Sequence, residues 1–276
     1  GTGFTIGPNP GYVWTRFTIT ETALGAGWNG EGSFEDGETE DYLLKIDEEP
    51  VYAEYGDAPE DALAYPSGVM GSFPTCVCCG PAGFVRHHMI WDGLILFGNS
   101  KDNEPDGNAG LCPTFPPYDQ DEGFYPGPDG GLMFPDIYTI DNTYNVVLLA
   151  ATGLPYIGYT NDAANWGVNA DIWVQNLAPV DAFVNVLADW NQNGQWGDSG
   201  EHILINHPIP IGFVGPLSAL MPPPFTIGSN SGHVWFRFTI TNIPLPSDWI
   251  GDGEFEDGET EDYLLLIEEG NPIASF

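Results

Sequence analysis

The chain contains one segment twice, and this duplication constrains the fold more than any other feature. Residues 4–49 and 225–270 align without a gap at a constant offset of 221, and 30 of the 46 aligned positions are identical. Solenoid and propeller repeats recur every ~20–50 residues, whereas a period of 221 is the size of a whole domain. The sequence therefore predicts part of a tandem array: residues 1–50 are the C-terminal part of a preceding repeat, residues 51–270 a complete domain, and residues 271–276 a tail.

The duplicated segment has the pattern of β-strands. In the first copy, Val13 and Phe17 alternate with Trp14 and Arg16, and residues 233–241 repeat this alternation. A period of two places successive side chains on opposite faces of a sheet.

Further strands are predicted along the chain, because 36 glycines and 25 prolines supply turns and no long apolar stretch has the helical period. They lie at residues 137–140, 144–150, 170–175, 183–188 and 202–205. Eight or more strands separated by turns favour an all-β fold, an antiparallel β-sandwich of Ig-like or jelly-roll-like type. The turn-rich residues 99–136 are expected to form long loops held by ions.

The charge balance excludes several partners. The chain carries 40 acidic residues against 5 lysines and arginines, a formal net charge of −35. Nucleic acid and anionic membranes need a basic footprint, so we expect neither as a partner, whereas divalent cations suit this surface. Solubility, or adaptation to a salty medium, is the alternative explanation of the acidity. No stretch is long and apolar enough to insert into a membrane, so the chain is expected to be soluble.

Four cysteines point to an oxidising compartment. Cys76, Cys78 and Cys79 are clustered, and Cys112 follows at a distance. Their spacing does not match a zinc knuckle, so a disulfide that joins the 76–79 loop to Cys112 is predicted, with free thiols as the alternative.

The most specific local motif is a predicted calcium site. Asp189, Asn191 and Asn193 alternate in front of Gly194, so their side-chain oxygens can converge on one point while the glycine turns the chain back. Hard oxygen donors favour Ca²⁺ over zinc. An EF-hand would need a glutamate at position twelve and flanking helices, but that position is glycine and the flanks read as strands. The remaining candidate ligands are Gln195, Asp198 and Glu201. A plain hairpin turn rich in Asp and Asn is the alternative.

A second calcium site is predicted in the long acidic loop. Asp102, Glu104 and Asp106 alternate before a glycine, and Asp119 and Asp121 follow close by. An exposed acidic loop without an ion explains the same pattern equally well.

Two of the three arginines occupy equivalent places in the repeat. Arg16 and Arg237 are expected to form structural ion pairs with the acidic strand that follows, Arg16 with Glu40 and Arg237 with Glu261. A solvated arginine is the alternative.

Several motifs together resemble the GEVED domain family. They are YGDAP at residues 55–59, DNEPDG at 102–107, DWNQNG at 189–194, RF at 237–238 and GETEDY at 258–263. The likeness covers about residues 53–267, and the last hexapeptide typically reads GEVEDY in the family. It implies a module of large secreted or surface bacterial proteins without catalytic activity. The cysteine cluster and residues 208–224 depart from the family pattern.

These observations favour a structural function. We expect an extracellular, calcium-stabilised module of a surface array or fibre, such as a pilus-like subunit. A glycan-binding adhesin is the first alternative, because the chain has nine tryptophans and twelve tyrosines. A glycosidase that uses a carboxylate pair such as Glu259 and Glu261 is less favoured, because the pair lies in a duplicated strand. His87 and His88 lack a partner motif for catalysis.

The isolated closing strands of residues 1–50 raise the question of what covers them. A two-stranded ribbon is marginal by itself and leaves apolar faces and unpaired edges. The strands can lie on the following domain, or the chain can be cut from a longer array that supplied the partner. The favoured possibility is completion by another copy of the chain, and a head-to-tail contact of this kind generates a fibre.

Overall fold

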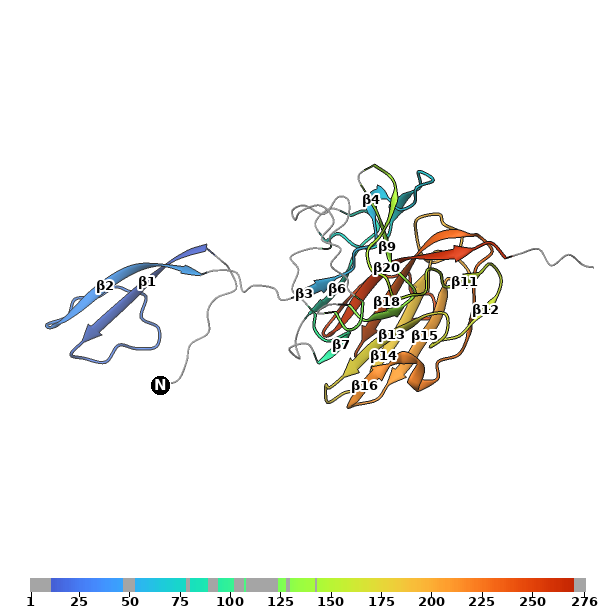
Figure 1. Ribbon diagram of the computed structural model, residues 1–276. Coiled ribbons are helices and arrows are strands. Elements are labelled where there is room, and N and C mark those ends of the chain that lie inside the picture. Colours follow the sequence, from blue (N-terminus) through green and yellow to red (C-terminus); the bar gives the residue numbers. More distant parts are fainter. Residues whose placement is uncertain are drawn as a thin grey trace, which may run out of the picture. The chain divides into compact units, whose positions relative to one another are not determined.

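The computed structural model describes residues 11–46, 53–77, 80–88, 94–101, 107, 124–127, 130–141 and 143–270. The chain divides into two compact units, Gly1–Val51 and Tyr52–Phe276 (Figure 1). The regular secondary structure of the described residues consists of strands and one short 3-10 turn, η1 (Leu217–Leu220). None of them forms a helix that is long and apolar enough to cross a lipid bilayer.

The first unit is a single antiparallel hairpin. Strand β1 (Gly11–Thr20) pairs with β2 (Gly37–Ile46) over their full length, from Gly11 opposite Ile46 to Thr20 opposite Gly37. We call residues 11–46 the N-terminal hairpin.

The second unit is an antiparallel sandwich, which confirms the predicted fold class. Its large sheet has the strand order β10-β9-β20-β18-β14-β15, and β11 adds to β20 in parallel. These strands are β9 (Tyr138–Ile140), β10 (Val146–Leu148), β11 (Gly158–Tyr159), β14 (Ala182–Ala188), β15 (His202–Ile209), β18 (Gly232–Thr241) and β20 (Gly258–Glu268).

The second layer is a smaller sheet of order β16-β13-β7, with β8 also paired to β13. Its strands are β7 (Ile95–Phe97), β8 (Leu132–Phe134), β13 (Asp171–Asn176) and β16 (Phe213–Pro216). Inward side chains of both layers, such as Val174 and Phe238, form one buried apolar cluster between them.

The opposite face of the large sheet is covered as well. Strands β3 (Ala53–Tyr55), β6 (Val85–His88) and β19 (Gly253–Phe255) form a three-stranded sheet. The ribbon of β12 (Ala163–Ala164) and β17 (Phe225–Thr226) belongs instead to the sandwich core, through Ala164 and Phe225. On the opposite face, strands β4 (Glu60–Leu63) and β5 (Met70–Ser72) form a further ribbon. Tyr65 and Phe73 of this region pack with Trp235 and Leu264 of the large sheet in a second buried cluster.

The central strands of the large sheet are therefore buried on both faces. In β18, Val234 and Phe238 face the sandwich core, whereas Trp235 packs in the second cluster. Every residue of β18 from Val234 to Thr241 is buried, including Arg237. We call residues 232–267 the closing hairpin, because they supply both central strands.

Candidate functional site: an acidic loop and a duplicated hairpin

The predicted calcium loop connects β14 to β15 and is anchored at both ends. Asp189 donates its backbone N–H to the carbonyl of Trp235, and Ala188 donates to the carbonyl of Glu201. Gly194 has a φ of +83°, and a Cβ there would lie 2.4 Å from the carbonyl oxygen of Met70. The positive φ predicted for Gly194 is confirmed. The close packing against β5 is a second reason for glycine at this position, which the sequence did not predict.

Asp189 is the buried centre of the loop. Its Oδ1 accepts the N–H of Asn193 at 3.0 Å, and its Oδ2 accepts the N–H of Gly194 and the hydroxyl of Tyr65, both at 2.8 Å. Burial raises the pKa of this carboxyl above its usual value. The loop thus uses Asp189 to bind its own turn and the β4–β5 region at the same time.

The two asparagines direct their amide nitrogens to one carboxylate oxygen. Asn191 and Asn193 donate to Oδ2 of Asp198 at 2.7 and 2.8 Å. Their carbonyl oxygens accept the backbone N–H groups of Asn193 and Gln195. The motif therefore forms the Asx-type turns of the alternative interpretation.

Glu201 is the side chain of this loop that best fits a cation. It is 2 % exposed, its Oε2 accepts the N–H of Asp198 at 3.0 Å, and its Oε1 has no hydrogen-bond partner. Burial, together with the charges of Asp189 and Asp198, raises its pKa to about 7. Within the described residues, no three acidic, histidine or cysteine side chains gather closely enough to form a metal cluster. Calcium at this loop stays a prediction.

Several predicted residues lie outside the described parts of the chain. They are Asp102, Glu104, Asp106, Asp119 and Asp121 of the second calcium loop, and Cys78, Cys79 and Cys112 of the disulfide framework. Cys76 is buried. The second calcium site and the cysteine pairing also stay predictions.

The arginine ion pairs exist, but with different partners from those predicted. Arg237 binds both oxygens of Asp262, through Nε at 2.8 Å and Nη2 at 2.5 Å, instead of Glu261. Arg16 likewise binds both oxygens of Asp41, through Nε and Nη2 at 2.7 Å each, instead of Glu40. The reason is strand register.

Arg237 is directly opposite Asp262, so both side chains project from the same face of the sheet. Glu261 is opposite Phe238 on the other face and accepts the hydroxyl of Tyr263 at 3.1 Å.

Buried polar contacts around the closing hairpin involve Lys101, which the sequence did not single out, and His87, which it left without a partner. Lys101 lies 3.1 Å from Asp257, and both side chains are buried. His87 contacts Thr260 at 2.8 Å, and burial lowers its pKa to about 3. The scarcity of cations was the available signal: Arg86, Lys101 and Arg237 all bind acidic residues of the second copy of the repeat.

The carboxylate pair considered for glycosidase chemistry is buried in β20. Glu259 accepts the N–H of Phe97, and Glu261 accepts the tyrosine hydroxyl described above. Both residues are less than 4 % exposed. They act as acceptors inside the sandwich.

The tryptophans considered for glycan binding are mostly interior in the second unit. Trp166, Trp190, Trp196, Trp235 and Trp249 are buried, and Trp173 stacks on Tyr125 with ring centroids 4.2 Å apart. Exposed, coplanar tryptophans do not occur among the described residues of this unit.

The N-terminal hairpin reproduces the closing hairpin in register and in internal bonds. Each strand pair aligns at the same offset of 221 residues, from Gly11–Ile46 onto Gly232–Ile267. Nη1 of Arg16 donates to the carbonyl of Gly30 at 2.9 Å, as Nη1 of Arg237 does to Gly251 at 2.6 Å. The pairs Thr18–Thr39 and Thr239–Thr260 are likewise bonded in both copies.

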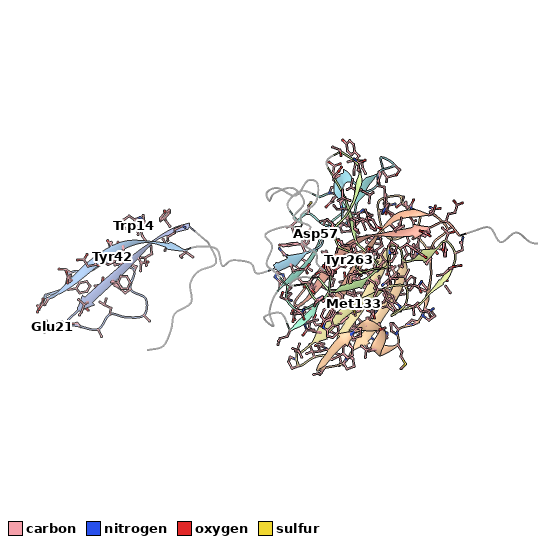
Figure 2. All side chains as sticks on the ribbon, in the orientation of Figure 1. Trp14, Glu21, Tyr42, Asp57, Met133 and Tyr263 are labelled. Atoms are coloured by element: carbon pink, nitrogen blue, oxygen red, sulfur yellow. The ribbon has the colours of Figure 1, made fainter. Side chains whose placement is uncertain are left out.

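Solvent exposure separates the two copies. Trp14 is 71 % exposed and Trp235 2 %, while Phe17 is 58 % exposed and Phe238 is fully buried. Figure 2 shows the side chains of Trp14 and Tyr42 on the N-terminal hairpin. Among the described residues, β1 and β2 pair only with each other. Within its own unit, the N-terminal hairpin therefore carries the apolar faces of a sheet centre without the layers that cover them in the closing hairpin.

Comparison with protein-family models, with curated proteins and with solved structures gives no match for this chain. The resemblance to the GEVED family therefore rests on the motifs alone.

Proposed function

We propose that this chain is an extracellular structural module of a surface array or fibre, which assembles with other copies of its repeat through the N-terminal hairpin. The observation that carries the proposal is the exposed state of a hairpin whose duplicate is the buried centre of a sandwich. Exposed apolar surface of this extent marks an interaction site, and an unpaired strand edge can accept another strand.

The acidic loop supports the proposal as a calcium-dependent stiffener. Burial, and then the nearby charges of Asp189 and Asp198, raise the pKa of Glu201, and its Oε1 has no hydrogen-bond partner. Bound Ca²⁺ would supply the missing positive charge and would be held by these carboxylates with Asn191, Asn193 and Gln195 as candidate ligands. The same loop contacts β5, since Ser72 donates to the carbonyl of Gly194 at 2.6 Å. Calcium here would thus tie the covering strands to the sandwich.

Chelation is expected to lower the stability of the second unit. An ion that binds only the folded state at a hundredfold excess over its Kd adds about 2.7 kcal/mol, which corresponds to a melting shift of about 5–10 °C for a domain of this size. The measurement is thermal unfolding at neutral pH in calcium and in excess chelator. Glu201→Gln should reduce the difference, and Asp181→Asn, at an exposed carboxylate outside the loop, should leave it intact. Equal melting in calcium and in chelator would contradict the calcium proposal.

Assembly is expected to depend on residues 1–50. The intact chain should self-associate as its concentration rises, because the N-terminal hairpin exposes apolar faces and strand edges, while a chain without residues 1–50 should stay monomeric. Light scattering and negative-stain imaging of the two chains make the comparison. If the intact chain is a monodisperse monomer at every concentration, assembly with identical copies is excluded.

A further inference from the structure

We infer that the N-terminal hairpin is a docking element for a sandwich body of this repeat type that has no closing hairpin seated in it. By sandwich body we mean the part of the repeat that corresponds to residues 53–231. The inference rests on the proposed role of the hairpin in assembly and names the partner that this hairpin fits.

Besides the pairing of β14 with β18, the body contacts the closing hairpin through a short segment, residues 53–75, which we call the cover segment. The cover segment forms hydrogen bonds with residues of the closing hairpin. The N-terminal hairpin has identical residues at the equivalent positions. Nε1 of Trp235 donates to the carbonyl of Ala64 at 2.8 Å, and Nη1 of Arg237 donates to the carbonyl of Pro74 at 2.7 Å. These backbone acceptors require only that the cover segment follows the same path.

The cover segment makes two more bonds with the acidic strand. The N–H of Ala58 donates to Oδ2 of Asp262, and Oε2 of Glu54 accepts the N–H of Thr260, both at 2.8 Å. The equivalent residues of the N-terminal hairpin are Trp14, Arg16, Asp41 and Thr39, identical to Trp235, Arg237, Asp262 and Thr260. These four groups that bind the cover segment are therefore present a second time.

The space for the cover segment is open on the N-terminal hairpin. A pocket of about 480 Å³ is lined by Trp14, Arg16, Trp28, Gly30 and Asp41, among others. On the closing hairpin, the equivalent space around the guanidinium of Arg237 is occupied by other residues of the second unit.

Gly56 approaches Arg237 so closely that a Cβ would lie 2.5 Å from Nη2, and the Trp196 ring lies 4.5 Å from the guanidinium carbon. Arg237 is fully buried as a result, whereas 45 % of the Arg16 side chain is exposed.

The second face of the hairpin fits the same body. Val13, Phe17 and Ile19 are exposed, and their equivalents Val234, Phe238 and Ile240 lie in the sandwich core. One body thus covers both faces at once, which another hairpin stacked on one face does not do.

The body of residues 53–231 is already occupied, because it holds the closing hairpin. If the N-terminal hairpin of one chain displaced the closing hairpin of another, one set of contacts would be replaced by an equivalent set. No additional surface would be buried. A net gain needs a body of the repeat without a hairpin of its own.

The inference is tested in the full chain by replacing residues 232–267 with the sequence of residues 11–46. The two segments have equal length, and 24 of their 36 positions are identical. We expect the second unit of this chimera to fold and to unfold cooperatively. Thr15 replaces the buried Phe236, which packs edge-on with Trp190 at 5.3 Å. A second chimera therefore keeps phenylalanine at position 236, and its melting temperature should lie within about 10 °C of that of the native chain.

A control chimera carries Trp→Ala and Arg→Ala at positions 235 and 237. It should lose cooperative unfolding, because the transplanted hairpin then lacks its bonds to the cover segment. The inference is overturned if the chimera that keeps phenylalanine at position 236 does not fold. It is also overturned if the control chimera is as stable as that one, because the retained groups would then play no part in recognition.

These outcomes are independent of the assembly experiment. A chimera that folds, together with a native chain that stays monomeric, supports the inferred partner and excludes assembly with identical copies. If the native chain assembles but the chimeras do not fold, the inferred partner is wrong. Assembly then uses contacts other than insertion of the hairpin into a sandwich body.

Discussion

Arg237→Ala is expected to destabilise the second unit by about 3–5 kcal/mol, the usual cost of removing one partner of a buried ion pair. The Arg237 side chain is fully buried, and its loss leaves Asp262 charged in the interior. The carbonyls of Pro74 and Gly251 each lose a hydrogen bond as well, and the Trp196 ring loses its cation contact. The measurement is urea unfolding followed by near-UV circular dichroism.

The matched variant is Arg16→Ala, which removes the same side chain from the same position of the other copy. Arg16 and Asp41 are both largely solvated, so the second unit should unfold at the same urea concentration as in the native chain. If both variants were equally mild, Arg237 would not be the buried anchor that its contacts indicate.

The fold class could be predicted from the sequence because its signals are local. The period-two alternation in residues 12–20 assigned Trp14 and Arg16 to one face and Val13 and Phe17 to the other, and the closing hairpin has this arrangement. The ion-pair partner was wrong by one residue, since Glu261 and Asp262 are adjacent in sequence but project from opposite faces. Only the register between the two strands decides between them.

The cover segment could not be predicted, because its contacts join residues far apart in the chain. Ala58 binds Asp262, and Ala64 binds Trp235. Neither alanine has a side chain that signals a contact, since both act through backbone groups. Gly56 is similar: its close approach to Arg237 is a property of the folded chain and not of its neighbours in sequence.

The turn of the acidic loop could be predicted from its motif, but its contacts with the rest of the fold could not. Alternating Asp and Asn residues before a glycine predicted a tight loop with converging oxygen atoms, and Asp189 and Gly194 occupy the expected places. Its contacts with Tyr65 and Ser72 were not predictable from the motif. Through them, the loop that is proposed to bind calcium also supports the segment that covers the closing hairpin.

Trp235→Ala is expected to lower the stability of the second unit, and Trp14→Ala to weaken self-association. Trp235 is 2 % exposed, packs near Phe73 with ring centroids 6.4 Å apart and donates to the carbonyl of Ala64. Its truncation removes this packing and leaves a cavity, so the second unit should lose about 3–5 kcal/mol. Urea unfolding of the intact chain measures this loss.

Trp14→Ala should leave that unfolding transition unchanged, because the Trp14 side chain is 71 % exposed and belongs to the other unit. Its effect should instead appear in self-association, measured by light scattering at increasing concentration, since the variant removes the largest apolar side chain of the exposed face. Trp235→Ala, examined under conditions in which it stays folded, should still associate. A Trp14→Ala chain that associates as strongly as the native chain would place the assembly contact on the strand edges or on the opposite face of the hairpin, because those surfaces are unchanged in the variant.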